Sequence, residues 1–442
     1  MLAPGVIESR WAPWSSTPAL GRVAVLGGFD PHSLPPFHLL EVTLSLPEPE
    51  ILTNLVSRVF SIDDVTIGDS QKEKYLFRYR GFLLQDDSAA AYDQLSGSLT
   101  PYGITPLFRM EDERQVVYLV KSQYVSSSSK VWVNILLFVL TVLSVWLAGA
   151  MYAYSYNHPN VQINSLVEMY RVTLLNFWDG LPFAISLMAI LLAHEFGHYI
   201  VGRLHKADVT LPYFIPMPIP GGFGTMGAVI QMKSPTRNRR SLLDIGIAGP
   251  IAGLVVAIPV LLLGLSLSKL GPVQPVSQLE GNSILYLLLK YAVFGKLLPA
   301  PVDYNGVVPF VYWVRYVITG TPSPIGGMDV QLNPIAWAGW VGLLVTSLNL
   351  IPAGQLDGGH VMYALVGKRM RKFLIPIMVM LAVLGFFWMG WWLWVFLLLA
   401  FGRISDEPLD QITQLDSRRK VVAVLALILF ILVFIPIPLA LV

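Results

Sequence analysis

One heptapeptide, Leu192-Ala193-His194-Glu195-Phe196-Gly197-His198, has residue types and a spacing that can bind a metal ion and activate water. Residues four apart share one face of a helix, so His194 and His198 can direct both imidazoles at one ion. Glu195 projects beside them, where a carboxylate can take a proton from metal-bound water. Zinc is the metal expected for this spacing.

The motif lies within an apolar run, Leu181 to Arg203, that is predicted to be a membrane-spanning helix. Ionisable side chains are costly in hydrocarbon, so three of them in one apolar helix require a partner, and a divalent metal is that partner. The alternative is a chance pattern in which the two histidines hydrogen-bond neighbouring helices. Ionisable groups within membrane helices are rare and usually functional, which favours the metal.

The composition predicts a polytopic α-helical membrane protein with a soluble part, since 54% of the 442 residues are hydrophobic and only 13% are charged. The chain has no cysteine, so nitrogen and oxygen atoms must hold any metal. The net charge of +2 gives no indication of nucleic-acid binding. Residues 1–22 lack the basic start and apolar core of a secretory signal.

The first 130 residues differ from the rest in their pattern of apolar and polar residues. The patterns predict an irregular arm over 1–36, a small soluble α+β domain over 37–125, a serine-rich linker over 126–130 and the membrane domain over 131–442. Within the soluble domain they predict a strand over 40–45, a helix over 49–60, a strand over 75–84, a helix over 89–99 and a hairpin over 106–120.

Apolar runs in the membrane domain predict about six or seven transmembrane helices. The predicted spans are 131–154, 181–203, 242–267, 335–352, 373–401 and 421–441, of which 373–401 is either one long helix or two short ones, with two favoured. Between Arg203 and Arg240 lie six basic residues and one acidic residue. The positive-inside rule therefore places this loop, the N-terminal domain and the metal end of the motif helix in the cytoplasm, and residues 268–334 on the outer side.

Two features are expected in the helix over 242–267. Ser241-Leu242-Leu243-Asp244 has the spacing of a capping box, which gives Asp244 a structural role at the start of the helix. Gly249 and Gly253 form a face on which a neighbouring helix can pack closely.

Residues 221–232 are too apolar for an exposed loop and too rich in glycine for a helix. We expect a re-entrant β segment at membrane depth, which protein or a watery cavity must cover. Its exposed edge can pair with an extended peptide along Gly227, Ala228 and Val229. The alternative is that the segment is a packing plug.

Two histidines leave a tetrahedral zinc ion short of a third protein ligand. Asp357 is the acidic residue that the predicted topology brings to the right depth, because it follows the span that ends at Pro352. The glycines after Asp357 allow a tight turn with close backbone approach. Two alternatives remain: Asp357 caps the turn, or His360 is the ligand.

Together these residues resemble the site-2 protease family of intramembrane zinc metalloproteases. The resemblance covers residues 130–442. It rests on His194-Glu195-x-x-His198, Leu356-Asp357-Gly358, Gly227-Ala228-Val229-Ile230 and Ala248-Gly249-Pro250. The soluble domain ahead of the membrane core resembles the bacterial and chloroplast branch. Gln355 stands where members often carry proline, which affects only the local shape of the turn.

The resemblance implies regulated intramembrane proteolysis, in which a membrane-anchored protein is cut within or near its transmembrane segment. His194, His198 and Asp357 would hold one zinc ion per chain, Glu195 would be general base and then acid, and Asn349 would bond substrate backbone or the oxyanion. The partners would be the lipid bilayer and membrane-anchored substrates, without nucleic acid. The chain would be a multi-pass protein of a bacterial-type plasma membrane or a chloroplast membrane.

Three other functions fit part of the pattern. A zinc membrane protease of the prenyl-protein-processing type also uses His-Glu-x-x-His, but the Leu-Asp-Gly turn argues against it. A metal transporter can line its pathway with histidine and aspartate, but it has no need of Glu195. A catalytically degenerate relative that only binds membrane proteins is disfavoured, because all four chemical groups are present.

Overall fold

The computed structural model describes residues 47–68, 75–122, 130–159, 161, 163, 165–275, 278–304, 306–402 and 407–441. The chain divides into two compact units, residues 1–53 and 54–442. The described part of the first unit contains the start of helix α1 (Pro49–Ser57). The predicted arm, the predicted strand over 40–45 and residues 126–129 of the predicted linker lie outside the described residues.

A four-stranded antiparallel sheet of order β1-β2-β4-β3 opens the second unit. Its strands are β1 (Phe60–Ile67), β2 (Phe77–Leu83), β3 (Ile104–Glu111) and β4 (Arg114–Lys121). Helix α2 (Ser88–Leu99) packs on the sheet through Tyr92, whose ring centroid lies 5.3 Å from that of Phe108. The predicted strand over 75–84 and the hairpin over 106–120 are confirmed. The predicted helix over 49–60 ends at Ser57, and β1 follows it.

The edge strand β3 is covered by a segment some 300 residues later in the chain. Phe108 donates its N–H to the carbonyl of Leu409, and Gln411 donates its N–H to the carbonyl of Phe108. The guanidinium of Arg109 donates to the carbonyls of Pro408 and Leu409. These bonds satisfy an otherwise open sheet edge and attach the small sheet to the loop before the last helix.

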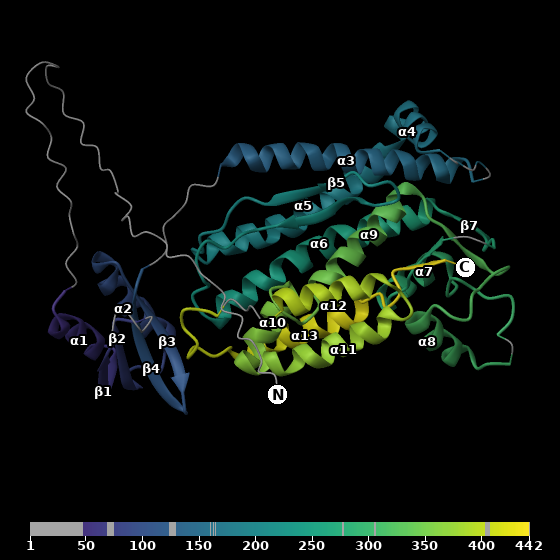
Figure 1. Cartoon of the computed structure of the whole chain (residues 1–442). Coiled ribbons are helices and arrows are strands. Elements are labelled where there is room, and N and C mark those ends of the chain that lie inside the picture. Colours follow the sequence, from purple (N-terminus) through teal and green to yellow (C-terminus); the bar gives the residue numbers. More distant parts are fainter. Residues whose placement is uncertain are drawn as a thin grey trace, which may run out of the picture. The chain divides into compact units, whose positions relative to one another are not determined.

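Three helical segments of the described chain are long and apolar enough to cross a membrane. They are α3 (Val131–Asn157), the stretch Phe177–Leu204 formed by η2 (Phe177–Gly180) and α5 (Leu181–Leu204), and α6 (Arg239–Leu267). Helices α5, α6 and α9 (Pro334–Asn349) pack side by side (Figure 1). Their shared core includes Leu187, Leu261 and Trp340. The fold is therefore that of a helical membrane protein.

Shorter elements complete this part of the chain. The helices are α4 (Leu166–Leu175), α7 (Ile284–Phe294), α8 (Pro309–Thr319), α10 (Asp357–Val366), α11 (Arg371–Gly385), α12 (Gly390–Phe401) and α13 (Ser417–Val433). The strands are paired as β5 (Tyr213–Met217) with β6 (Gly224–Val229), β7 (Lys269–Pro272) with β9 (Met328–Gln331), and β8 (Gln278–Glu280) with β10 (Leu439–Leu441). The run over 373–401 is interrupted, as expected, between α11 and α12.

The start of α6 differs from the prediction. Asn238 is the N-cap, and its side-chain oxygen accepts from the backbone N–H of Arg240 and Ser241. The Ser241 hydroxyl accepts in return from the N–H of Asn238, so Ser241 closes a capping box rather than opening one. Asp244 takes no part in the capping box. Its carboxylate accepts a hydrogen bond from Arg419 at 2.7 Å and lies 3.1 Å from Nε2 of His205.

The predicted final span over 421–441 is wrong at its end. Helix α13 stops at Val433, and the chain continues extended to β10, which pairs with β8. Pro436 and Pro438 explain the stop, because proline lacks the N–H of a helical bond and drives the residue before it into extended conformations.

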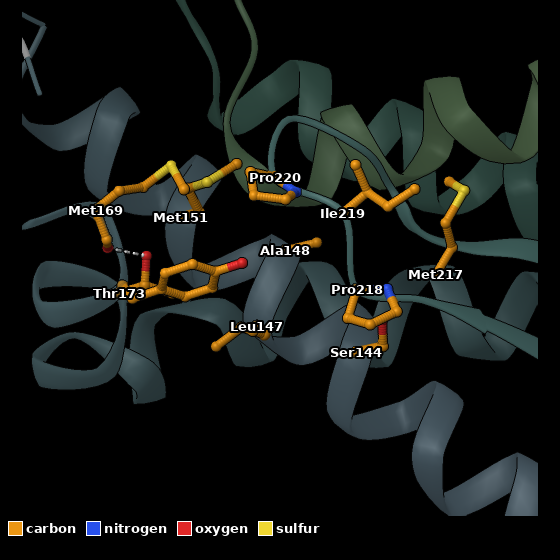
Figure 2. A pocket seen from close by; sticks show the side chains of 11 residues that line it. Ser144, Leu147, Ala148, Met151, Met169, Thr173, Met217, Pro218, Ile219 and Pro220 are labelled. Atoms are coloured by element: carbon orange, nitrogen blue, oxygen red, sulfur yellow. Dashed lines mark hydrogen bonds between the residues drawn. The ribbon is translucent and has the colours of Figure 1, made fainter. Parts of the chain in front are cut away.

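The glycine-rich segment forms the second strand of a hairpin. Figure 2 shows the residues of the hairpin turn, Met217 to Pro220, around an apolar pocket with α3 and α4. From α3 come Ser144, Leu147, Ala148 and Met151, and from α4 Met169 and Thr173. The pocket encloses only about 20 Å³, so the hairpin turn is packed against these helices.

Replacing Gly224 by alanine tests this attachment. Its φ is +80°, and an added Cβ would lie 2.5 Å from Cα of Val145 in α3. We expect the free energy of unfolding to fall by about 3 kcal/mol, from left-handed strain and overpacking together. Gly221 is the matched control, since its φ is +77° and no atom lies within 4 Å of an added Cβ. The free energy of unfolding of Gly221→Ala should fall by only about 1 kcal/mol. Both variants are measured by SDS denaturation, and equal losses would contradict close packing on α3.

Candidate metal centre and active site

Three side chains from two helices converge on one point. His194 and His198 lie one turn apart on α5, and Asp357 is the first residue of α10. The Nε2 atoms of the two histidines are 3.3 Å apart, and each lies 3.3 Å from Oδ2 of Asp357. The three atoms thus form a triangle of equal sides, which the sequence-based placement of Asp357 anticipated.

This triangle has the dimensions of a zinc site. Ligands at 2.0–2.1 Å from a tetrahedral ion are about 3.3–3.4 Å from one another. The donor set, two imidazole nitrogens and one carboxylate oxygen, is the type found in catalytic zinc sites, which leave the fourth position for water or substrate. The residues therefore fit a zinc ion held by His194, His198 and Asp357.

The backbone of α6 orients one of the rings. Nδ1 of His198 lies 2.7 Å from the carbonyl oxygen of Ile245. Nδ1 must carry the hydrogen to donate to this carbonyl, so the lone pair is on Nε2, the atom that faces Asp357 and His194. Support of a metal-binding histidine by a carbonyl at its other nitrogen is the usual arrangement in metal sites. The sequence carries no signal for this contact, since any residue supplies a carbonyl.

Glycines on α6 make the room for these side chains. An added Cβ at Gly249 would lie 2.0 Å from Nε2 of His198, and one at Gly253 would lie 3.2 Å from Nδ1 of His194. In the opposite direction, a Cβ at Gly197 on α5 would lie 2.6 Å from the carbonyl oxygen of Ala248. The predicted close-packing face is therefore confirmed, and what it accommodates includes the two histidine rings.

The triangle opens into a pocket of about 180 Å³. Glu195, Asn349, Ala228 and Val229 line it together with the three ligand residues. The side-chain nitrogen of Asn349 lies 3.2 Å from Nε2 of His194. Gly227 adjoins this lining on β6, with φ +97° and open space beside it. The residues predicted to hold metal, catalyse and bind substrate thus lie at or beside one pocket.

The turn that carries Asp357 differs in detail from the expectation. The tight turn lies before it, at Gly354 with φ +60°, and Gly358 already belongs to helix α10. Close backbone approach is nevertheless present, since a Cβ at Gly358 would lie 1.9 Å from the carbonyl oxygen of Leu350. His360 lines the pocket but is not part of the ligand triangle.

An HExxH pair on an apolar helix, completed by an aspartate from a second helix, defines a membrane metalloprotease type of centre. Comparison with known families agrees: the profile of peptidase family M50 matches residues 182–389, which include all three ligand residues. The part of the chain that carries the site is thus similar to peptidase family M50, the site-2 proteases.

Curated relatives share most of the chain. It is 28% identical to the probable zinc metalloprotease EGY1, chloroplastic, of Arabidopsis thaliana over 376 residues, which are 81% of this chain and 61% of that protein. It is 25% identical to the probable zinc metalloprotease EGY2, chloroplastic, of Oryza sativa subsp. indica over 421 residues, which are 90% of this chain and 68% of that protein. The chain thus spans about three fifths of the EGY1 length. No solved structure matches it.

Replacing Gly249 by alanine should weaken metal binding although no ligand residue is substituted. The new Cβ would occupy the position of the His198 ring, so we expect zinc affinity to fall at least about 100-fold, as measured by competition with a chromophoric chelator. Gly253→Ala is the graded control, because its Cβ lies 3.2 Å from the His194 ring and a small shift relieves the contact. Wild-type zinc affinity in Gly249→Ala would show that His198 does not hold the metal in this rotamer.

Proposed function

We propose that this chain is an intramembrane zinc endopeptidase that hydrolyses peptide bonds within or near transmembrane segments of membrane-anchored proteins. The observation that carries the proposal is the convergence of three ligand atoms, a buried glutamate and a strand in one pocket. The similarity to peptidase family M50 and the names of the chloroplastic relatives agree with this activity.

The predicted metal, catalytic and oxyanion residues of the pocket have the following roles in this proposal. A zinc ion bound by His194, His198 and Asp357 would supply a Lewis acid for the peptide carbonyl and the attacking water. Glu195 takes the proton of that water and passes it to the leaving nitrogen. Asn349 donates its amide hydrogens to the substrate carbonyl, where negative charge develops.

Strand β6 gives the substrate a place to unwind. A peptide bond inside a helix is shielded and already hydrogen-bonded, so it must be extended before water can attack it. The edge of β6 that β5 does not occupy belongs to the same hairpin whose Ala228 and Val229 line the pocket. An extended substrate paired along this edge would carry its scissile bond to the three ligands. In this proposal Gly227, Ala228 and Val229 bind substrate instead of acting only as a packing plug.

We also propose a multi-pass topology with the active site toward the cytoplasmic or stromal side. Helices α3, α5 and α6 are the long spans, and α9, α11, α12 and α13 would add shorter ones, which together give about seven crossings. The basic residues near the ends of α5 and α6 support this orientation. The relatives named as chloroplastic favour a photosynthetic membrane over a plasma membrane.

Replacing Glu195 by glutamine separates proteolysis from metal transport. The amide cannot accept the water proton, so we expect peptide hydrolysis by the reconstituted chain to fall about a thousandfold. Zinc content should stay at one ion per chain, because Glu195 is not one of the three ligand residues. The measurement pairs cleavage of a single-span peptide with zinc flux into the same vesicles.

Asp357→Asn is the companion variant, since it weakens the metal site itself and should lower both zinc content and hydrolysis. Zinc flux in the wild-type chain that persists in Glu195→Gln, without peptide hydrolysis by either, would favour the transporter.

Substitution of Met226 on β6 tests the docking of an extended substrate. Its side chain is 68% exposed, so proline there removes a backbone N–H from the strand without disturbing a core. We expect cleavage to be at least ten times slower in Met226→Pro than in Met226→Ala, with equal zinc content in the two. Equal cleavage rates would exclude backbone pairing at this point of β6.

A further inference from the structure

A second polar cluster lies outside the metal centre, on the elements predicted to face the outer side. Glu280 ends β8, Asp329 lies on β9 and Lys290 lies on α7, and all three are buried. Nζ of Lys290 is 3.7 Å from Oε1 of Glu280 and 3.5 Å from Oδ1 of Asp329. Tyr286 donates its hydroxyl hydrogen to the same Oε1 at 2.9 Å.

The cluster is short of positive charge. Two carboxylates face one ammonium group, and Oδ2 of Asp329 is buried without a hydrogen-bond partner among the described residues. Burial, followed by the charge of Asp329, raises the pKa of Glu280 above its ordinary value. Lys290 alone therefore does not compensate the pair, and a second cation would stabilise both carboxylates in their charged form.

Both carboxylates line a pocket of about 530 Å³, large enough for a long side chain and its backbone. Aromatic rings form another part of its lining. Tyr152 and Trp337 stack with centroids 5.0 Å apart, and Phe223 lies 5.9 Å from Trp337. Acidic groups beside aromatic rings suit a lysine or arginine side chain, whose stem packs on the rings while its charge reaches the carboxylates.

Two elements connect the pocket lined by Glu280 and Asp329, here called the acidic pocket, to the pocket at the ligand triangle, here called the metal pocket. Phe223, in the turn directly before β6, lines the acidic pocket, and Ala228, five residues later on β6, lines the metal pocket. Five extended residues cover at most about 17 Å. On α5, Phe183 lines the acidic pocket and His194 the metal pocket, and eleven helical residues also cover about 17 Å. The helix therefore sets the separation at about 17 Å, and the hairpin is long enough to span it.

We propose that the acidic pocket is a specificity site that binds a lysine or arginine of the substrate, about five residues from the scissile bond on its outer side. The inference rests on the proposed proteolysis, because the substrate must lie extended along β6 to reach both pockets. The competing explanation is that the three charges form a buried salt-bridge cluster whose only role is to hold α7, β8 and β9 together.

The test uses the full chain in proteoliposomes and synthetic single-span peptides. Each peptide carries one lysine, or glutamine in the matched peptide, at successive positions, and the cut is located by mass spectrometry. We expect lysine about five residues to the outer side of the cut to raise kcat/KM about tenfold over glutamine. Asp329→Asn and Glu280→Gln should abolish this preference while glutamine peptides are cut at the wild-type rate.

Two further variants complete the experiment. Asp303→Asn, an exposed acid in the same outer region that does not line the pocket, should keep the preference. Gln278→Lys, which places an ammonium on the exposed rim of the pocket, should abolish the preference without removing a buried group.

The outcomes separate this inference from the proposed function. If the wild-type chain cuts the peptides but kcat/KM does not depend on the position of the lysine, the specificity site alone is overturned. Asp329→Asn and Glu280→Gln could instead cut lysine and glutamine peptides equally slowly, while Gln278→Lys keeps the preference for lysine. That result would show that the three charges have only a structural role, and it would also overturn the specificity site. If the wild-type chain cuts no peptide, or if Glu195→Gln cuts as well as wild type, the proposed function falls and the inference falls with it.

Discussion

Close contact between α5 and α6 is the constraint on which the site depends. A Cβ at Gly249 or Gly197 would collide with the facing helix, so the two helices reach this distance only because both positions lack side chains. In hydrocarbon, such packing drives helix association, since burying apolar surface gains little there. The short distance also brings the Ile245 carbonyl onto His198, so one helix contact both stabilises the fold and orients a ligand.

The third ligand depends on a second close approach. Helix α9 ends at Asn349, and the chain turns through Gly354 before α10 begins at Asp357. Gly358 lies so near the Leu350 carbonyl that no side chain fits between them, which fixes the start of α10 against the end of α9. The turn thereby holds the carboxylate in place before any metal binds.

The sequence predicted the parts of the site that depend on local spacing or on topology. His194 and His198 follow from helical periodicity, and Asp357 follows from the depth at which its span ends. The Ile245 carbonyl and the role of Gly249 beside a histidine ring were not predictable, because they depend on how two helices pack. Two errors had local signals: Asn238 is a good N-cap residue, and Pro436 and Pro438 preclude the helix that apolarity alone suggested.

The hairpin satisfies a requirement that the helices alone cannot meet. Helices close their backbone hydrogen bonds internally, so they offer an unwound peptide nothing to pair with, whereas a strand edge has free backbone groups. A strand edge at membrane depth, as proposed for β6, needs cover and a fixed position. The hairpin turn packs against α3 and α4, which positions β6. The end of β6 at Ala228 and Val229 lines the pocket that also contains the three ligand residues. Because the hairpin turn packs against α3 and α4, the protein itself sets where β6 lies relative to the acidic pocket and the ligand triangle.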